Sequence, residues 1–239
     1  MRPPARGMHG EVVVTSVVEV LARLDEKANP ANLDGMARYG MTVDRRLGVA
    51  VPEMRRLAKE IGPDHALALD LWATGIAEAR MVAGMIAVPD LLTASELESW
   101  VGDLDSWDVC DQLCMNLLER SSVARDMIDE WSRRDEEFVR RAAFALIACL
   151  AWHDKQAPDE VFLDYLPLIV RGSTDDRNYV KKAVSWALRT IGKRSRALNS
   201  AAIATAREIR QLDSRAARWI AADVLRELES EKTIARLKT

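Results

Sequence analysis

The chain has 239 residues, of which 49% are hydrophobic and 30% are charged, and its formal net charge is −3. This composition describes a soluble globular protein long enough for one large domain or one repeat array with a sizeable core. The apolar stretch from Val12 to Leu21 is interrupted by Glu19 and is too short to span a membrane, so we expect a cytoplasmic protein without a membrane partner.

Charge is unevenly distributed along the chain. Between Arg171 and Arg218 there are 12 Lys and Arg against 4 Asp and Glu, a net charge of +8, and the remainder carries −11. A basic patch on an acidic body predicts a localised site for a polyanion, because the local field depends on the patch rather than on the total charge. On charge alone, solvated helix faces that happen to be basic remain an equal alternative.

Helical spacing of apolar residues, without period-two alternation, predicts an all-α chain. Residues 1–10 contain two Pro and two Gly and predict a disordered leader, and residues 11–239 predict a single repeat domain. The segment from Tyr39 to Val51 has no clear period and is expected to be a loop. The expected helices cover 11–28, 31–37, 52–61, 64–74, 76–88, a segment from the Thr93 and Glu96 capping box to Gly102, 106–119, 122–133, 136–151, 158–170, 177–192, 199–212 and 214–229.

A weak internal repeat indicates how these helices are arranged. Val139-Arg-Arg-Ala-Ala-Phe-Ala-Leu and Val180-Lys-Lys-Ala-Val-Ser-Trp-Ala-Leu align at a 41-residue offset, and Ser214-Arg-Ala-Ala-Arg-Trp-Ile-Ala is a looser third copy. Helix pairs repeating at about 40 residues are typical of HEAT-like α-solenoids, in which neighbouring pairs stack because none can bury its apolar face alone. We expect the functional residues on the concave wall of such a solenoid.

The three cysteines, Cys110, Cys114 and Cys149, suit a reducing compartment. Cys110 and Cys114 share a helix face, yet no His or second Cys pair lies nearby in sequence to complete a zinc site. We therefore expect buried apolar thiols and no metal.

The most informative motif is Trp107-Asp-Val-Cys-Asp111, which sets an aromatic ring and a carboxylate one helical turn apart. Asp105 or Ser106 can cap the start of this helix, so Asp108 falls in the first turn, where free N–H groups and the helix dipole favour a carboxylate. Asp111 lies in the second turn and has no such structural explanation. It is therefore a candidate functional carboxylate.

The helix expected over 177–192 combines an aromatic residue with cations. Val180, Val184, Ala187, Leu188 and Ile191 form one apolar stripe, and Lys182, Trp186, Arg189 and, just past the end, Lys193 lie opposite it. This combination suits phosphates and nucleic-acid surfaces, although an exposed Trp lying over neighbouring Lys and Arg stems is the structural alternative. Arg141, in the same register as Lys182, is expected to reach along the surface toward a neighbouring repeat.

These residues restrict the possible chemistry. His9, His65 and His153 have no context for a Ser–His or Cys–His pair, and no Gly-rich phosphate loop or metal-ligand cluster is present. Cleavage of the N-glycosidic bond of an alkylated, cationic purine fits, because the base is already a good leaving group. Such a reaction needs one carboxylate, aromatic surfaces and cations that hold phosphates.

The Trp107-to-Asp111 motif resembles the Trp-Asp-x-x-Asp signature of the AlkD-like DNA alkylation repair glycosylases. Arg141 in Arg-Arg-Ala-Ala-Phe, and Trp186 and Arg189 in Lys-Lys-Ala-Val-Ser-Trp-Ala-Leu-Arg, resemble that family too, and the similarity extends from about Tyr39 to Leu228. The resemblance implies HEAT-like repeats and excision of N3- or N7-alkylated purines without a metal or organic cofactor. It also implies Asp111 as the catalytic carboxylate, Trp107 and Trp186 as aromatic walls, and Arg141 and Arg189 as DNA-backbone contacts.

We therefore predict a monomeric, monofunctional DNA glycosylase acting on double-stranded DNA that contains alkylated bases, with Lys182 and Lys193 as further DNA contacts. One alternative is a non-catalytic solenoid that recognises distorted or branched DNA through residues 171–218. Another is a protein-binding scaffold with Trp107 and Trp186 as interface anchors. A lyase reaction is disfavoured, because no Lys has a sequence context that suggests burial.

Overall fold

Helices account for all the regular secondary structure of residues 16–237, the part of the chain described by this computed structural model. The all-α prediction is therefore confirmed over these residues, and the leader predicted for 1–10 lies outside them. One layer contains α1 (Val17–Asp25), α4 (His65–Ala73), α6 (Ala94–Gly102), α8 (Ser122–Asp126), α9 (Ile128–Trp131), α11 (Asp159–Leu163), α12 (Leu166–Gly172) and α14 (Arg196–Arg210). The second layer contains α3 (Val51–Ile61), α5 (Ala77–Ile86), α7 (Trp107–Asn116), α10 (Glu137–His153), α13 (Asn178–Ile191) and α15 (Arg215–Leu228).

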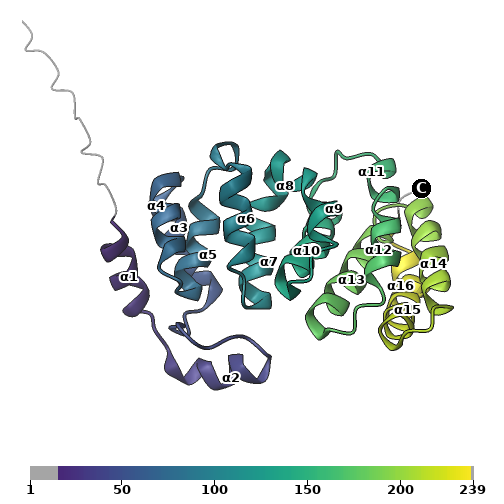
Figure 1. Cartoon of the computed structure of the whole chain (residues 1–239), viewed down its shortest axis with the longest axis horizontal. Coiled ribbons are helices and arrows are strands. Elements are labelled where there is room, and N and C mark those ends of the chain that lie inside the picture. The colour runs from purple at the N-terminus through teal and green to yellow at the C-terminus, as the bar shows by residue number, and fades with distance from the viewer. Residues whose placement is uncertain (1–15, 238–239) are drawn as a thin grey trace, which may run out of the picture.

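The helices of the second layer follow one another in a row from α3 near one end of the molecule to α15 at the other (Figure 1). Each packs against the next, in the order α3, α5, α7, α10, α13 and α15. Helices of the first layer pack on them as pairs, such as α4 with α5, α12 with α13 and α14 with α15. This arrangement is the stack of helix pairs that the 41-residue repeat predicts.

Shorter elements connect or end the pairs. They are α2 (Leu33–Arg38), α16 (Glu231–Ile234) and the 3₁₀ turns Pro30–Asn32, Pro89–Leu91 and Leu118–Arg120. The helix expected over 106–119 ends at Asn116 and continues as the last of these 3₁₀ turns. The short α16 was not predicted, because a single turn carries no measurable periodicity.

Several expected helices have different boundaries in the structure. The helix expected over 11–28 ends at Asp25, and residues 11–15 of it lie outside the described residues. The segment 122–133 is divided into α8 and α9, and 158–170 is divided into α11 and α12. Pro167 explains the second division, because a proline lacks the N–H that would continue α11 and instead fits the start of α12. The helix expected to start at 199 begins at Arg196, because the hydroxyl of Ser195 accepts the N–H of Leu198 at 3.1 Å and caps it.

One buried apolar cluster extends from Val20 to Leu228 through both layers. The predicted apolar stripe of α13, from Val180 to Ile191, is completely buried. α10 is buried on several sides at once, because α7, α9 and α13 all pack against it. The position of α10 between α7 and α13 brings functional residues of three repeats together.

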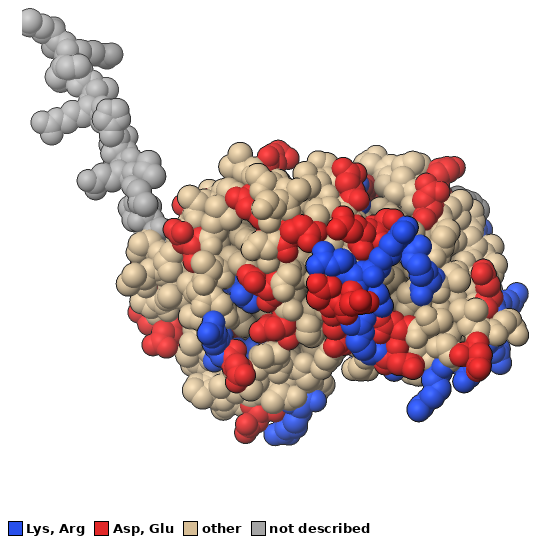
Figure 2. Space-filling model, in the orientation of Figure 1, with Lys and Arg blue, Asp and Glu red and all other residues tan. Residues whose placement is uncertain are grey.

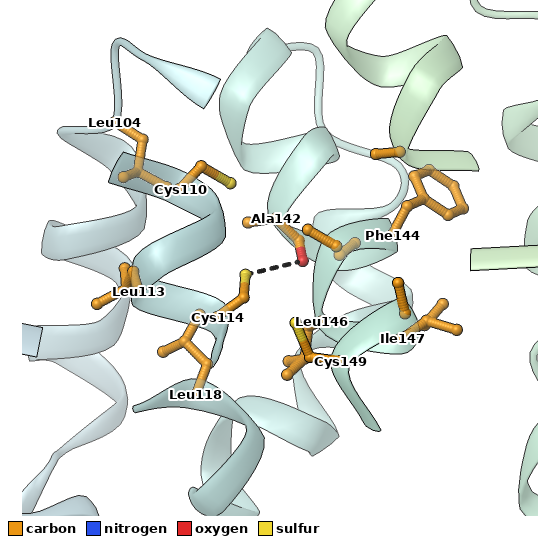
Figure 3. Packing of buried hydrophobic residues seen from close by; sticks show 14 of the residues in the cluster. Leu104, Cys110, Leu113, Cys114, Leu118, Ala142, Phe144, Leu146, Ile147 and Cys149 are labelled. Carbon is orange, nitrogen blue, oxygen red and sulfur yellow. Dashed lines mark hydrogen bonds between the residues drawn. The ribbon is translucent and has the colours of Figure 1, made fainter. Parts of the chain in front are cut away.

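The cysteines pack in the interface between α7 and α10 (Figure 3). Cys110, Cys114 and Cys149 are free and buried, as expected. Burial raises the pKa of the Cys114 and Cys149 thiols well above the ordinary value, so both are unreactive apolar fillers. Within residues 16–237, no helix has the length and apolar character needed to cross a bilayer.

The contact between α12 and α10 gives a stability prediction. A Cβ atom on Gly172, the last residue of α12, would overlap the ring of Phe144, which is fully buried and cannot move aside. We expect Gly172→Ala to lower the free energy of unfolding by roughly 1–3 kcal/mol, because it overpacks the core. Chemical denaturation of the purified variant measures this loss.

Gly102→Ala is a matched control. Gly102 is likewise the last residue of its helix, α6, but a Cβ atom there meets nothing within 4 Å. We expect this variant to be as stable as the original chain or slightly more stable, because Ala favours helix over Gly. Equal stability of the two variants would show that α12 and α10 do not pack as described.

Candidate nucleic-acid site

The carboxylate of Asp111 and the guanidinium of Arg141 form a bidentate ion pair between α7 and α10. Arg141 Nη2 donates to Oδ1 at 2.9 Å and to Oδ2 at 2.8 Å, and Nε donates to Oδ1 at 3.1 Å. The remaining Nη1 donates to the backbone oxygen of Tyr179 on α13 at 2.6 Å. A single side chain from α10 therefore joins the helices on both sides of it.

Burial and charge act in opposite directions on this pair. Burial raises the pKa of Asp111, and the neighbouring guanidinium of Arg141 opposes that rise. The side chain of Arg141 is only 6% exposed, whereas that of Asp111 is 13% exposed. Because all three donor nitrogens of Arg141 are engaged inside the protein, its placement does not support the expected contact with a DNA phosphate. Arg141 instead orients Asp111.

Trp107 lies beside this pair, as the spacing of the motif predicts. The guanidinium carbon of Arg141 lies 5.9 Å from the centroid of the Trp107 ring, a cation–π distance. The indole N–H of Trp107 donates to the backbone oxygen of Tyr39 at 3.1 Å. The ring is therefore fixed at both ends, by α10 on one side and by the segment that follows α2 on the other.

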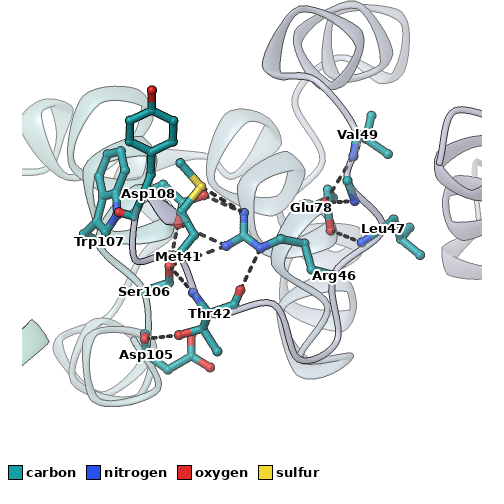
Figure 4. A network of polar contacts seen from close by, with 12 residues as sticks. Met41, Thr42, Arg46, Leu47, Val49, Glu78, Asp105, Ser106, Trp107 and Asp108 are labelled. Atoms are coloured by element: carbon teal, nitrogen blue, oxygen red, sulfur yellow. Dashed lines mark hydrogen bonds and ion pairs between the residues drawn. The ribbon is translucent and has the colours of Figure 1, made fainter. Parts of the chain in front are cut away.

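The segment from Tyr39 to Ala50, which we call the strap, holds the start of α7 (Figure 4). Arg46 is buried and donates to both carboxylate oxygens of Asp108, at 2.6 and 3.0 Å. The hydroxyl of Ser106 donates to Asp108 at 2.5 Å, and Thr42 donates its backbone N–H to that hydroxyl at 3.3 Å. Asp108 is therefore structural, as its place in the first turn suggested, although its main partner is an arginine.

Two further contacts fasten the strap. Glu78 on α5 is buried, and its carboxylate accepts the backbone N–H groups of Leu47, Gly48 and Val49 at 3.0, 2.8 and 3.3 Å (Figure 4). On the other side, the hydroxyl of Tyr179 donates to the oxygen of Gly40 at 2.7 Å. Gly40 has a φ of 74°, and a Cβ atom there would overlap the Tyr179 hydroxyl, so only glycine permits this approach.

A cavity of about 240 Å³ opens beside Asp111 and Trp107. Five methionines contribute to its wall, namely Met36, Met41, Met54, Met81 and Met115. Methionine side chains are flexible and polarisable, so such a wall adapts to flat rings of different shape. Asp111, Asp108 and Arg46 supply its charged groups.

The structure does not place Trp186 in the cavity beside Asp111. Trp186 lies on α13 and lines a separate cavity of about 500 Å³, because α10 stands between α7 and α13. Arg189 and Lys193 line that second cavity too, and both bind the carboxylate of Glu227, at 2.7 and 2.8 Å. The residues expected to form one cluster thus form two groups, one on α7 and α10 and the other on α13 and just beyond its end.

The basic segment 171–218 is partly neutralised. Six of its cations have a carboxylate within 4 Å, and most of these carboxylates lie outside the segment; the six are Arg171, Arg177, Arg189, Lys193, Arg207 and Arg218. Lys182, in contrast, is exposed on α13. Basic and acidic side chains lie side by side across the face shown in Figure 2. The electrostatic attraction for a polyanion is therefore weaker than the sequence count suggests.

Comparison with known proteins identifies the family. The family described as "DNA alkylation repair enzyme" matches residues 20–222. The chain belongs to this family. The match covers the strap, the residues that line both cavities and the motif from Trp107 to Asp111.

The chain also resembles solved structures of other proteins. One, described as belonging to "a new family of proteins related to the HEAT-like repeat DNA glycosylases with affinity for branched DNA structures", superposes with a TM-score of 0.72 at 22% identity, over 90% of this chain and 96% of that one. Two engineered proteins match at 16% and 14% identity over 91% of this chain and 93% and 95% of theirs, with TM-scores of 0.43 and 0.38. No curated protein matches the chain in sequence. The match with a TM-score of 0.72 confirms the predicted HEAT-like α-solenoid fold of this DNA alkylation repair family member.

The ion pair between α7 and α10 gives a prediction for stability. Replacing Arg141 with Ala leaves the carboxylate of Asp111 poorly solvated and without its counter-ion. We expect the free energy of unfolding to fall by about 3–5 kcal/mol, as for other buried pairs that lose one partner. Denaturant unfolding followed by circular dichroism measures it.

Arg133→Ala is the control for this substitution. Arg133 also binds an aspartate, Asp129, but the two side chains are 60% and 53% exposed. Its removal should change the free energy of unfolding by about 0–1 kcal/mol. Similar losses in the two variants would mean that the pair formed by Asp111 and Arg141 is solvated rather than buried.

Proposed function

We propose that the chain is a monofunctional DNA glycosylase that removes cationic N3- or N7-alkylated purines from duplex DNA. The observation that carries this proposal is the placement of Asp111. Its carboxylate is held in one orientation by the bidentate contact with Arg141, lies next to the ring of Trp107, and borders a cavity on the protein surface. Membership of the DNA alkylation repair family supports a DNA substrate over the protein-binding alternative.

The proposed reaction follows from the charge of the substrate. Alkylation gives the purine a positive charge, so the glycosidic bond breaks with its electron pair moving onto the base and neutralising it. The sugar left behind is oxocarbenium-like, and the fixed carboxylate of Asp111 stabilises that positive charge. Asp111 then accepts a proton from the water molecule that forms the new bond to the sugar. The base needs no general acid, which agrees with the lack of a histidine in the wall of the cavity.

We assign roles in this reaction to the surrounding side chains as well. Trp107 provides an aromatic face for the electron-poor sugar or base, and the methionine wall contacts the flat, apolar parts of the lesion. Trp186, Arg189, Lys182 and Lys193 contact the DNA one repeat further along, on α13 and just beyond its end. Action as a monomer in the cytoplasm, without a metal or organic cofactor, is part of the proposal.

A second candidate is binding of branched DNA without base removal. Two observations favour it. The positive charge of Arg141 compensates the negative charge of Asp111, which weakens the stabilisation that the carboxylate can offer to a cationic sugar. The solved structure with the TM-score of 0.72 is described as having affinity for branched DNA. On this alternative, the chain binds DNA with strong salt dependence and releases no base.

Asp111→Asn tests the first proposal. The amide keeps the shape of the side chain but removes its negative charge and its capacity to accept a proton. We expect the rate of release of 7-methylguanine and 3-methyladenine from methylated duplex DNA to fall by at least about 100-fold. Chromatography of the released bases, at a temperature where circular dichroism shows every variant folded, measures the rate.

The control is Asp105→Asn, the same change at an exposed carboxylate just before α7. Asp105 contributes only its backbone oxygen to the strap, through the hydroxyl of Thr42, so this variant should release bases at the original rate. Undiminished release by Asp111→Asn would remove Asp111 from the mechanism. DNA binding without release by the original chain would select the second candidate.

A further inference from the structure

The second cavity contains an aromatic side chain to which the proposed glycosylase chemistry gives no role. This cavity of about 500 Å³ lies where α10 ends beside the last turns of α13. Trp152, from the end of α10, and Trp186, from α13, both line it. Trp152 is 53% exposed, although it directly follows the buried apolar run of α10. A large aromatic ring left in solvent at the mouth of a cavity is a candidate contact surface.

The charged groups of this cavity are all cations. Its wall includes Lys155, Arg189, Lys193 and Arg194 and no Asp or Glu. Arg194 has a structural role in the wall, because its guanidinium donates to the backbone oxygens of Ala151, Asp154 and Ala157. Those contacts fix the end of α10 and therefore the backbone that carries Trp152.

The other three cations differ in how firmly they are held. Arg189 and Lys193 share Glu227, which lies outside the cavity wall. Lys155 is exposed and has no carboxylate within 4 Å among the described residues. At least one cation at the edge of the cavity is therefore available to a phosphate.

We propose that this cavity, the Trp152–Trp186 cleft, binds an unpaired DNA strand. One or two bases stack on the two indole rings, and Lys155 and Lys193 hold the adjoining phosphates. Bases inside a duplex already stack on each other and present only their edges. The exposed ring of Trp152 and the accessible part of Trp186, which packs partly against the core, therefore select for unpaired nucleotides. The proposal rests on the DNA-directed function proposed above and adds the form of DNA that the chain recognises.

The position of the cleft relative to Asp111 suits a branched substrate. Arg141, which holds Asp111, lies near the start of α10, and Trp152 lies near its end. Eleven residues of α-helix separate them, a distance of roughly 16 Å along the axis. When a duplex is bound beside Asp111, a strand displaced from it can therefore reach the cleft along the protein surface.

Binding of lesion-free DNA to Trp152→Ala tests this proposal. Three labelled DNAs of matched length are compared by titration at low salt: a thymidine single strand, a perfect duplex and a duplex with a single-stranded flap. We expect Trp152→Ala to weaken binding of the single strand and the flap by about 5- to 100-fold, the usual effect of losing one stacked base. Binding of the perfect duplex should change less than about twofold.

Trp219→Ala is the matched control. Trp219 is also exposed, at 42%, and also has a nearby cation, Lys181, at 5.0 Å, but it lies on α15 and does not line the cleft. This variant should bind all three DNAs as the original chain does. Lys155→Ala, which changes no aromatic contact, should weaken the single strand and reduce the dependence of its binding on salt concentration.

Equal weakening for all three DNAs, no weakening in Trp152→Ala, or failure of the original chain to bind the single strand would each overturn the proposal. Loss of flap binding in Trp219→Ala to the same degree would also overturn it. None of the DNAs carries a lesion, so the outcome does not depend on whether Asp111 supports base release. The glycosylase proposal can therefore fail while the cleft is confirmed, and the cleft can fail while the glycosylase proposal is confirmed.

Discussion

The ion pair between Asp111 and Arg141 is the interaction on which the site depends. It connects α7 to α10, and through the backbone oxygen of Tyr179 it extends to α13. A carboxylate at this depth would otherwise be destabilised by burial, which raises its pKa. The guanidinium opposes that rise in pKa and fixes the direction of the carboxylate within an apolar stack of helices.

The strap, which comes earlier in the chain than α7, also supports the site. Its residues Gly40 and Arg46 reach Tyr179 and Asp108, which lie 139 and 62 positions further along the chain. These contacts hold the start of α7 and the indole of Trp107 without using the stacking of the repeats. The strap is thereby a structural component of the site, and the cavity lined by methionines lies between the strap, α2, α3, α5 and α7.

The sequence could predict what depends on local spacing. The i and i+4 positions of Trp107 and Asp111 put them together, and the helical wheel of α13 identified its buried stripe. Spacing could not show the partner of Arg141, because Lys182 at the equivalent place one repeat later is exposed while Arg141 is buried between α7 and α13. The contact of Arg46 with Asp108 depends on the path of an irregular loop, which has no period. The separation of Trp186 from Asp111 depends on α10, whose width only the packing reveals.

We propose that a fixed carboxylate, with no acid to protonate the leaving base, acts on DNA bases that already carry positive charge. The most direct test is to incubate the chain with duplexes containing either 7-methylguanine, which is cationic, or O6-methylguanine, which is neutral, and to quantify the free bases by chromatography. We expect release of the cationic base and none of the neutral one. Release of both at similar rates, or of neither, would contradict it.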